Sequence, residues 1–218
     1  MQAVWHAVHG DPEVLQLVEF PDPEPGKDEA VVEVRAAGLN RLDILQRIGP
    51  PLLPGFCLPH VPGMDVAGVV AARGSSVRGV EEGTRVVVKP GIHCGRCEWC
   101  SRGDDRLCTD VEVIGGTRPG GYAEYCVVPA THVFAIPEQA SFEEAATIPT
   151  AVSTAWRALV QTAQLRAGES VVIHGPGSGV TIAAVQIAKH AGATVLVTGR
   201  SEQKLRQALK IGADHVVN

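Results

Sequence analysis

The chain has 218 residues, of which 45% are hydrophobic and 20% are charged, and its net charge is −5 at pH 7. This composition is typical of a globular protein with a sizeable core, and the absence of a basic run argues against partners such as nucleic acid or an anionic membrane surface. The first residues show neither the basic and apolar segments of a signal peptide nor a stretch long enough to span a membrane, so we expect a cytoplasmic location.

Short runs typical of β-strands alternate with glycine and proline in the first part of the chain. The runs are rich in valine, and turn segments such as Pro21–Gly26 and Gly79–Gly83 lie between them. The predicted strands are Ala30–Arg35, Asp65–Val70, Arg85–Val88 and Tyr122–Val128. This pattern predicts a small β-barrel or β-sandwich over residues 1–140.

Four cysteines lie close together in one loop. The gaps between Cys94, Cys97, Cys100 and Cys108 are two, two and seven residues. Such short gaps let neighbouring thiolates converge on one ion, and four thiolates suit Zn²⁺ in a closed, structural site. The alternative is an iron–sulfur cluster, although the bacterial ferredoxin spacing ends with three residues and Cys-Pro, whereas threonine follows Cys108 here.

The two remaining cysteines have no such neighbours. We expect Cys57 and Cys126 to be free and to serve only in packing, as buried cysteines usually do.

After residue 140 the pattern changes to strands that alternate with helices. Ser141 and Glu144 form a capping-box signature, and apolar residues recur at helical spacing from Val180 to Ala191. The predicted strands are Ser170–His174, which we expect to be buried, Thr194–Thr198, and a third that begins at His215; another helix is capped by Ser201 and ends at Gly212. This β-α-β-α-β order predicts the first half of a doubly wound parallel sheet over residues 141–218.

The loop between the first of these strands and its helix is rich in glycine. In dinucleotide sites such a loop lets the pyrophosphate approach the backbone at the helix N-terminus. The candidate cofactor-binding residues are Gly175, Gly177, Ser178, Gly179 and Val180, of which Val180 replaces the third glycine of the G-x-G-x-x-G pattern. A tight strand-to-helix turn without a ligand is the alternative.

The end of the second strand bears on the choice of cofactor. An NAD site usually places an acidic residue here, to bind the ribose 2′-hydroxyl. In this chain Gly199 is followed by Arg200 and Ser201, which could hold a 2′-phosphate. We therefore expect NADP(H) rather than NAD(H); the alternative is that Arg200 is only solvated.

Several motifs together resemble the medium-chain dehydrogenase/reductase superfamily, which includes zinc alcohol dehydrogenases and quinone reductases. They are the four-cysteine loop, Gly63–Gly68, Gly79–Val86, Gly121–Tyr125 and Val172–Lys189. The resemblance covers essentially the whole chain. It implies an α/β protein with a GroES-like β-barrel domain over residues 1–140, the first half of a Rossmann doubly wound parallel sheet over residues 141–218, and an active site in the cleft between them.

Alcohol dehydrogenases of this family also carry a catalytic zinc. The resemblance places Asn40, Met64 and Thr150 at the three ligand positions, and none of these is a good zinc ligand. Asp43 and Asp65 match neighbouring positions that are usually acidic. His60 lies close in sequence, but we expect a surface or capping histidine there rather than a replacement ligand.

The missing ligands favour one type of reaction. Without a Lewis acid an alcohol proton is hard to remove, whereas hydride addition to a conjugated carbonyl or quinone needs only hydrogen bonds to the developing charge. The resemblance therefore implies an NADPH-dependent reductase of such small molecules. Its candidate catalytic residues are Asn40 as donor to the substrate carbonyl, Asp43 as the neighbour that orients it, and Thr150.

Other readings stay open at this point. One is a zinc-dependent alcohol dehydrogenase with an atypical site that uses His60, Asp43 or Asp65, and another is a non-catalytic nucleotide-binding or scaffold protein. Four apolar residues either border the substrate or belong to the core, which ordinary burial preferences favour: Ile44, Ile48, Phe56 and Trp156.

Members of this family continue for roughly a hundred residues beyond the first mononucleotide half. We therefore expect a truncated member of the family. Its strand Val171–His174 would then form an apolar sheet edge, and such edges pair with other chains. The expected result is self-association through this edge or completion by another chain.

Overall fold

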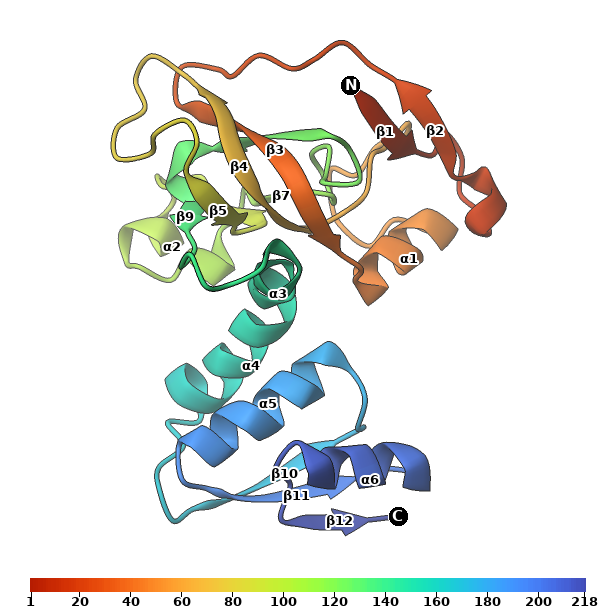
Figure 1. Cartoon of the computed structure of the whole chain (residues 1–218), viewed down its shortest axis with the longest axis vertical. Coiled ribbons are helices and arrows are strands. Elements are labelled where there is room, and N and C mark those ends of the chain that lie inside the picture. The colour runs from red at the N-terminus through yellow and green to blue at the C-terminus, as the bar shows by residue number, and fades with distance from the viewer. The chain divides into compact units, whose positions relative to one another are not determined.

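The computed structural model describes residues 1–218, and the chain forms two compact units, Met1–Pro149 and Thr150–Asn218 (Figure 1). The sequence pattern divided the chain at residue 140, before helix α3 (Phe142–Ala146), whereas the compact units divide after it. Ala145 and Ala146 of this helix are buried against Ala67 in the sheet of the first unit.

A five-stranded antiparallel sheet forms the centre of the first unit, with the strand order β8-β3-β4-β5-β9. The strands are β3 (Glu29–Gly38), β4 (Asp65–Arg73), β5 (Arg85–Val88), β8 (Tyr125–Pro129) and β9 (Val133–Ala135). Alternate residues face one core, because side chains in a strand alternate between its two faces. Buried pairs of this kind are Ala30 and Val32, Val86 and Val88, and Cys126 and Val128.

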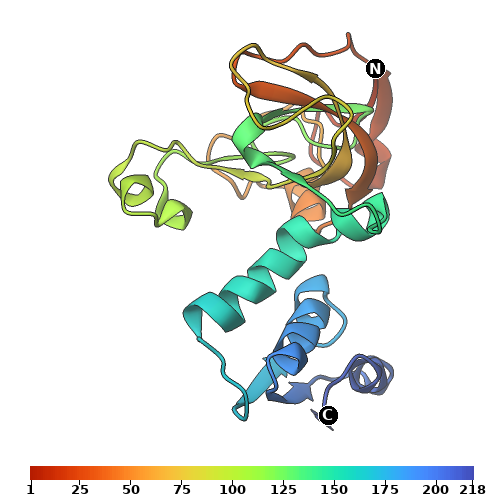
Figure 2. The ribbon, with the colours of Figure 1, turned by 60° about the vertical axis from the view of Figure 1, so that its left-hand side comes forward.

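Two short hairpin-like pairs and several short helices complete the first unit. Strand β1 (Gln2–Trp5) pairs with β2 (Gln16–Glu19), and β6 (Gly91–Ile92) pairs with β7 (Glu112–Val113). The helices are α1 (Arg41–Ile48), α2 (Glu98–Ser101) and the 3₁₀ turns Pro12–Val14, Asp105–Leu107 and Ala130–His132. Figure 2 shows α2 in a loop that projects from the sheet.

The second unit has a three-stranded parallel sheet in the order β10-β11-β12. Its strands are β10 (Ser170–His174), β11 (Thr194–Thr198) and β12 (His215–Val217), and its long helices are α5 (Gly179–His190) and α6 (Glu202–Lys210). Helix α4 (Ser153–Trp156) lies between the π-helical turns Ile148–Val152 and Arg157–Thr162. The core contains Val185, Val195 and Val197, each fully buried.

The predicted strands and helices are present, although β3 and β4 extend three residues beyond their predicted ends. Strand β8 begins at Tyr125 rather than at Tyr122. Strand β10 is not buried throughout, since it lies at the edge of its sheet and Val172 is 54% exposed. The capping box of α3 is formed as expected, with the Glu144 N–H donating to Ser141 Oγ and the Ser141 N–H to Glu144 Oε2.

Some expectations about burial are wrong. Ile44, Ile48 and Trp156 are 49%, 47% and 48% exposed, so they do not belong to a core. Cys57 and Cys126 are both free cysteines, as expected. Cys126 is buried, but Cys57 is exposed and so does not serve in core packing. None of the helices is both long enough and apolar enough to cross a bilayer.

Candidate functional site

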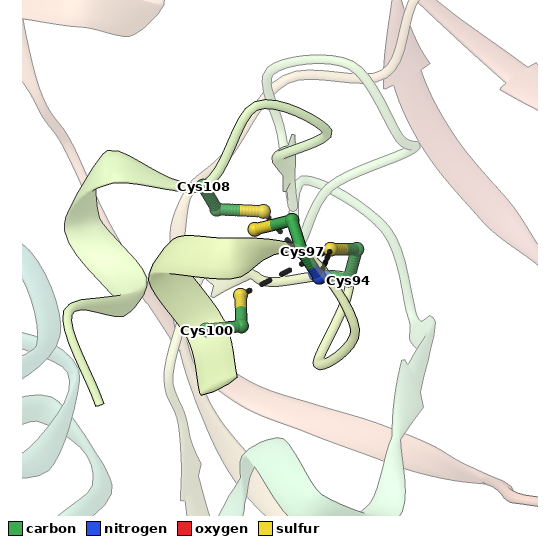
Figure 3. Close-up of side chains that lie close together, drawn as sticks. All are labelled: Cys94, Cys97, Cys100 and Cys108. Atoms are coloured by element: carbon green, nitrogen blue, oxygen red, sulfur yellow. Dashed lines mark hydrogen bonds between the residues drawn. The ribbon is translucent and has the colours of Figure 1, made fainter. Parts of the chain in front are cut away.

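The four clustered cysteines converge on one point (Figure 3). Their sulfur atoms all lie within 4.8 Å of one another, and Cys94 Sγ is 3.9 Å from Cys100 Sγ. Four sulfurs at about 2.3 Å from one zinc ion stand about 3.8 Å apart in a tetrahedron. The cluster therefore fits a single tetrahedral zinc with no position left for a substrate.

Backbone amides around this cluster favour ionised sulfurs. The Cys94 N–H and the Asp110 N–H point at Cys108 Sγ from 3.4 Å each. The N–H groups of Cys100 and Thr109 lower the pKa of the Cys97 thiol to about 6. Burial, together with the neighbouring Cys97 sulfur, raises the pKa of Cys100 to about 12. A divalent cation would remove this conflict, because it stabilises all four thiolates together.

A second polar cluster lies where strand β3 meets helix α1. Asn40 is the residue before the helix, and its backbone N–H donates to Asp43 Oδ2 at 2.8 Å. Its side-chain Nδ2 donates to Asp65 Oδ2 at 3.0 Å, and the Tyr122 hydroxyl donates to Asp43 Oδ2 at 3.0 Å. Both acidic side chains are buried, with Asp43 5% and Asp65 3% exposed. Asp65 therefore holds the carboxamide of Asn40 in place, and Asp43 holds its backbone N–H.

The buried position of Asp43 shifts its titration. Burial raises its pKa above the ordinary value of 3.8, and the charge of Asp65 adds to the effect. Hydrogen bonds from the Asn40 N–H, the Tyr122 hydroxyl and the Gly63 N–H act in the opposite direction. Tyr122 was not a candidate site residue in the sequence, where it appeared only inside a glycine motif and at the start of a predicted strand. Burial also raises the pKa of its hydroxyl, which keeps it protonated and available as a donor.

The other expected site residues take different places. Met64 is buried. The sequence predicted a surface or capping histidine at position 60, but His60 is buried. Its Nε2 lies 3.0 Å from the Gly115 carbonyl oxygen. It packs among the rings of His6 and Phe56 instead of joining Asp43 and Asp65. Thr150 is the first residue of the second unit, in the turn Ile148–Val152.

The four cysteines are also the one group of three or more histidine, cysteine or acidic side chains in residues 1–218 whose ligand atoms converge closely enough to hold a metal. The alternative site built from His60, Asp43 and Asp65 is therefore not assembled in this structure.

The glycine-rich loop has the form of a phosphate-binding turn. Gly175 and Gly177 have φ angles of 77° and 96°, a left-handed backbone that favours glycine. Ser178 is the N-cap of α5, and its Oγ accepts a hydrogen bond from the Thr181 N–H at 3.1 Å. The Thr181 hydroxyl donates to the Gly175 carbonyl at 2.9 Å, which closes the turn. Such a turn presents backbone N–H groups and the positive end of the helix to an anion.

A cavity of about 430 Å³ opens beside this loop. It is lined by Gly175, Pro176, Thr198, Gly199, Arg200, Ser201 and Lys204. The structure thus brings together Gly175 and the Arg200–Ser201 pair, three of the predicted cofactor residues, around one space. Gly177 lies next to this lining, since a Cβ on it would be 3.1 Å from Lys204 Cδ.

Lys204 is a residue that the sequence analysis missed. It is in the first turn of α6, where its backbone N–H faces the N-cap Ser201 Oγ at 3.4 Å. Side chains in a helix lean toward its N-terminus, which brings this ammonium group to the cavity. The signal in the sequence was a lysine three residues after a capping serine.

Comparison with known proteins agrees with this architecture. Residues 26–138 match the alcohol dehydrogenase GroES-like domain, and residues 179–218 match the zinc-binding dehydrogenase family. An alcohol dehydrogenase of Schizosaccharomyces pombe is 34% identical over 215 residues, which cover 98% of this chain and 61% of that protein.

Two solved structures show the same fold. An NAD-dependent alcohol dehydrogenase has a TM-score of 0.94 and 47% identity, over 100% of this chain and 63% of that one. The quinone oxidoreductase of Escherichia coli complexed with NADPH has a TM-score of 0.82 and 31% identity, over 100% of this chain and 58% of that one. The chain spans about three fifths of the length of these relatives. With its GroES-like domain and Rossmann-type parallel sheet, it belongs to the medium-chain dehydrogenase/reductase superfamily, a family of oxidoreductases.

Proposed function

We propose that the protein is an NADP(H)-dependent oxidoreductase that reduces a quinone or a conjugated carbonyl by hydride transfer and uses no catalytic zinc. The observation that carries this proposal is the polar cluster at the start of α1. Its centre is a carboxamide, Asn40, held by Asp65, and the residue before Asp65 in the sequence is Met64, a thioether. Carboxamide and thioether groups are poor zinc ligands, whereas a carboxamide N–H is a good donor to a carbonyl oxygen.

Asn40 is the proposed catalytic residue. One of its two Nδ2 protons is committed to Asp65 Oδ2, so the second is free to point at a substrate oxygen. Asp43 is a positioning residue in this scheme, because it fixes the backbone N–H of Asn40 and is itself fixed by Tyr122. Thr150 remains a candidate on the resemblance alone.

A bound nicotinamide would supply the hydride, and the chain would supply the binding groups. The turn Gly175–Thr181 would hold the pyrophosphate with Gly177, Ser178, Gly179 and Val180, while Arg200, Ser201 and Lys204 would hold a 2′-phosphate at the cavity. Two cations and no carboxylate line that cavity. Relatives of the family include both an NAD-dependent enzyme and one complexed with NADPH, so the preference for NADP(H) rests on these residues.

We also propose that Cys94, Cys97, Cys100 and Cys108 hold one structural zinc ion, on the basis of the sulfur geometry. All six cysteines are free thiols in this fold, which suits a reducing compartment such as the cytoplasm.

Two measurements test the proposal. Elemental analysis of the purified protein should find one zinc per chain, and two per chain would contradict a site without catalytic zinc. Fluorescence titration should show NADPH binding at least tenfold tighter than NADH binding. A protein that binds neither nucleotide at millimolar concentration would instead support a non-catalytic role for this chain.

A further inference from the structure

The end of strand β11 and the phosphate-binding turn are in unusually close contact. A Cβ atom built on Gly199 would lie 2.7 Å from Pro176 Cγ and closer still to Pro176 Cδ. Real Cβ atoms essentially never approach another heavy atom within 3.0 Å. The next nearest atom, Leu205 Cδ2, is at an ordinary contact distance of 3.6 Å. Pro176 alone therefore excludes a side chain at position 199.

The backbone of Gly199 gives no other reason for glycine. Its φ angle lies outside the left-handed region, whereas Gly175 and Gly177, on either side of the proline, have φ angles of 77° and 96°. Any residue could adopt the backbone conformation at position 199. The absence of a side chain there is thus set by the neighbouring loop.

Neither partner in this contact can easily move away. The Gly175 N–H donates to the Thr198 carbonyl at 2.9 Å, and the Gly199 N–H donates to the Val217 carbonyl at 3.0 Å. The Thr181 hydroxyl holds the Gly175 carbonyl at 2.9 Å. A proline ring also has no flexible end, because its Cδ is bonded to the backbone nitrogen and its φ is fixed.

The contact between Pro176 and Gly199 lies at the position that selects between NAD and NADP in dinucleotide sites. Sites that bind NAD hold the ribose 2′-hydroxyl with an acidic side chain at the end of the second strand. We propose that Pro176 is a specificity-determining residue: with Gly199 it closes the position that an NAD-selecting carboxylate would need, and it leaves the cavity to a 2′-phosphate near Arg200 and Lys204. This inference rests on the proposed NADP(H) dependence.

The contact predicts that an acidic residue at position 199 is not enough to change the cofactor. Gly199→Asp should weaken the binding of both nucleotides at least tenfold, since its side chain must displace the phosphate-binding turn. The double variant Pro176→Ala with Gly199→Asp should bind NADH at least tenfold more tightly than Gly199→Asp alone, while NADPH stays weak. The measurement is nucleotide fluorescence titration of the wild type, both single variants and the double variant.

Two results would overturn the inference. One is a Gly199→Asp protein that binds NADH more tightly than the wild type does. The other is a double variant that binds NADH no better than Gly199→Asp alone.

A cofactor-independent measurement separates this inference from the proposed function. In urea unfolding, Gly199→Ala should lower the folding equilibrium constant at least tenfold in the wild type but only slightly in the Pro176→Ala background. Gly91→Ala is the matched control, because a Cβ there would meet nothing closer than the His93 ring at 3.7 Å.

Additive effects of Gly199→Ala and Pro176→Ala on unfolding would show that the contact is not restrictive and would refute the inference. Strong coupling in a protein that binds no nucleotide would instead leave the contact established and remove the proposed function.

Discussion

Asn40 illustrates how one side chain can be both structural and chemical. It stands at the N-cap position of α1, a common place for asparagine, and its backbone N–H is bound by Asp43 Oδ2. Its carboxamide, however, points to the buried Asp65 instead of serving only the helix. A carboxylate that accepts one amide proton fixes the direction of the other, which is the arrangement needed for a preorganised donor.

Replacement of this donor should therefore affect turnover more than binding. We expect Asn40→Ala to lower kcat for quinone reduction by about 10²–10³, the usual cost of removing one donor from a developing oxyanion, with a smaller change in KM. Steady-state kinetics with NADPH measures both constants.

Gln16→Ala is the matched control, because it removes an exposed carboxamide in the same unit. If Asn40→Ala changed kcat no more than Gln16→Ala does, Asn40 would have only its helix-capping role.

A buried group of histidines forms a second feature at the residue scale. His6 is fully buried, its Nδ1 lies 3.1 Å from the Val8 carbonyl oxygen, and its Nε2 has no hydrogen-bond partner. It packs against Phe56 and His60, with ring centroids 6.3 and 6.0 Å away. The charged groups that face it are His9 and Arg47, so a proton on His6 would meet cations and no carboxylate.

Burial lowers the pKa of His6 and of His60 below the ordinary value of 6.5, and the facing His9, Arg47 and His6 charges add to this. Well above pH 6.5 both rings are neutral in the folded and in the unfolded chain, so they do not change the free energy of unfolding. As the pH falls below 6.5, the unfolded chain takes up protons first. The free energy of unfolding should therefore fall, until the pH passes the lowered folded-state values.

Urea unfolding between pH 7.5 and 5 measures this effect. In His6→Phe, which keeps an aromatic ring in the cluster, the fall with decreasing pH should be smaller than in the wild type. The exposed His190→Gln serves as control and should keep the wild-type slope. Identical slopes in wild type and His6→Phe would contradict a neutral, buried His6.

At the scale of elements, the cysteine loop depends on its ion more than on its own secondary structure. Helix α2 has only four residues and the turn Asp105–Leu107 only three, and neither contains a buried residue. Helices of this length are unstable alone. Ion pairs of Asp105 with Lys89 and His93 attach the loop to the unit, but such exposed pairs contribute little.

Removal of zinc should therefore unfold this loop while the five-stranded sheet persists. With a strong chelator, trypsin cleavage after the exposed Arg96 and Arg102 should become at least tenfold faster, with little change in the β-sheet signal by circular dichroism. Cys100→Ser should show the same fast cleavage without chelator, and Cys57→Ser, which removes an exposed thiol, should not. Equal cleavage rates with and without zinc would exclude a stabilising metal in this loop.

Most elements could be predicted because their signals are local. The caps at Ser141, Ser178 and Ser201 each accept from the N–H three residues later, as the capping pattern requires. The strands of the parallel sheet follow from short runs of β-branched residues between helical periods. Local patterns do not show which strand becomes an edge. The run of β-branched residues predicted a buried strand at Val172, whereas only the resemblance to the family indicated an apolar edge there, and Val172 is half exposed.

The same limit applies to single apolar residues. Ile44 and Ile48 are one turn apart on α1, a spacing that suits a core position, yet both are half exposed. His60 shows the opposite error. A polar residue was expected outside, but His60 is buried against the rings of His6 and Phe56, and its Nε2 lies within hydrogen-bond distance of the Gly115 carbonyl oxygen.

For the molecule as a whole, strand β10 bears on whether the chain associates with other chains in solution. Its free edge is unpaired in the order β10-β11-β12, and Val172 is exposed on it. Unpaired N–H and C=O groups on an apolar strand favour pairing with another chain. We propose that the chain self-associates through this edge or is completed there by a second polypeptide.

Size-exclusion chromatography with light scattering tests this behaviour. The mass should rise with protein concentration above that of one 218-residue chain, and Val172→Lys, a charge on the edge, should reduce the effect. Val217→Lys places the same charge at a similarly exposed valine on β12, the other edge strand, and should leave association through β10 unchanged. A wild type that stays monomeric at all concentrations would exclude association through β10.

The sequence by itself determined the family, the order of strands and helices in the second unit, and the cysteine and glycine motifs, because these depend on residue spacing along the chain. Only the tertiary structure decided which distant groups meet. In the fold Asp65 contacts Asn40, and Tyr122 contacts Asp43. Lys204 lines the cofactor cavity, and Pro176 lies in close contact with Gly199. These contacts join residues from separate strands, helices and loops, and their distances are set by packing, which no local pattern records.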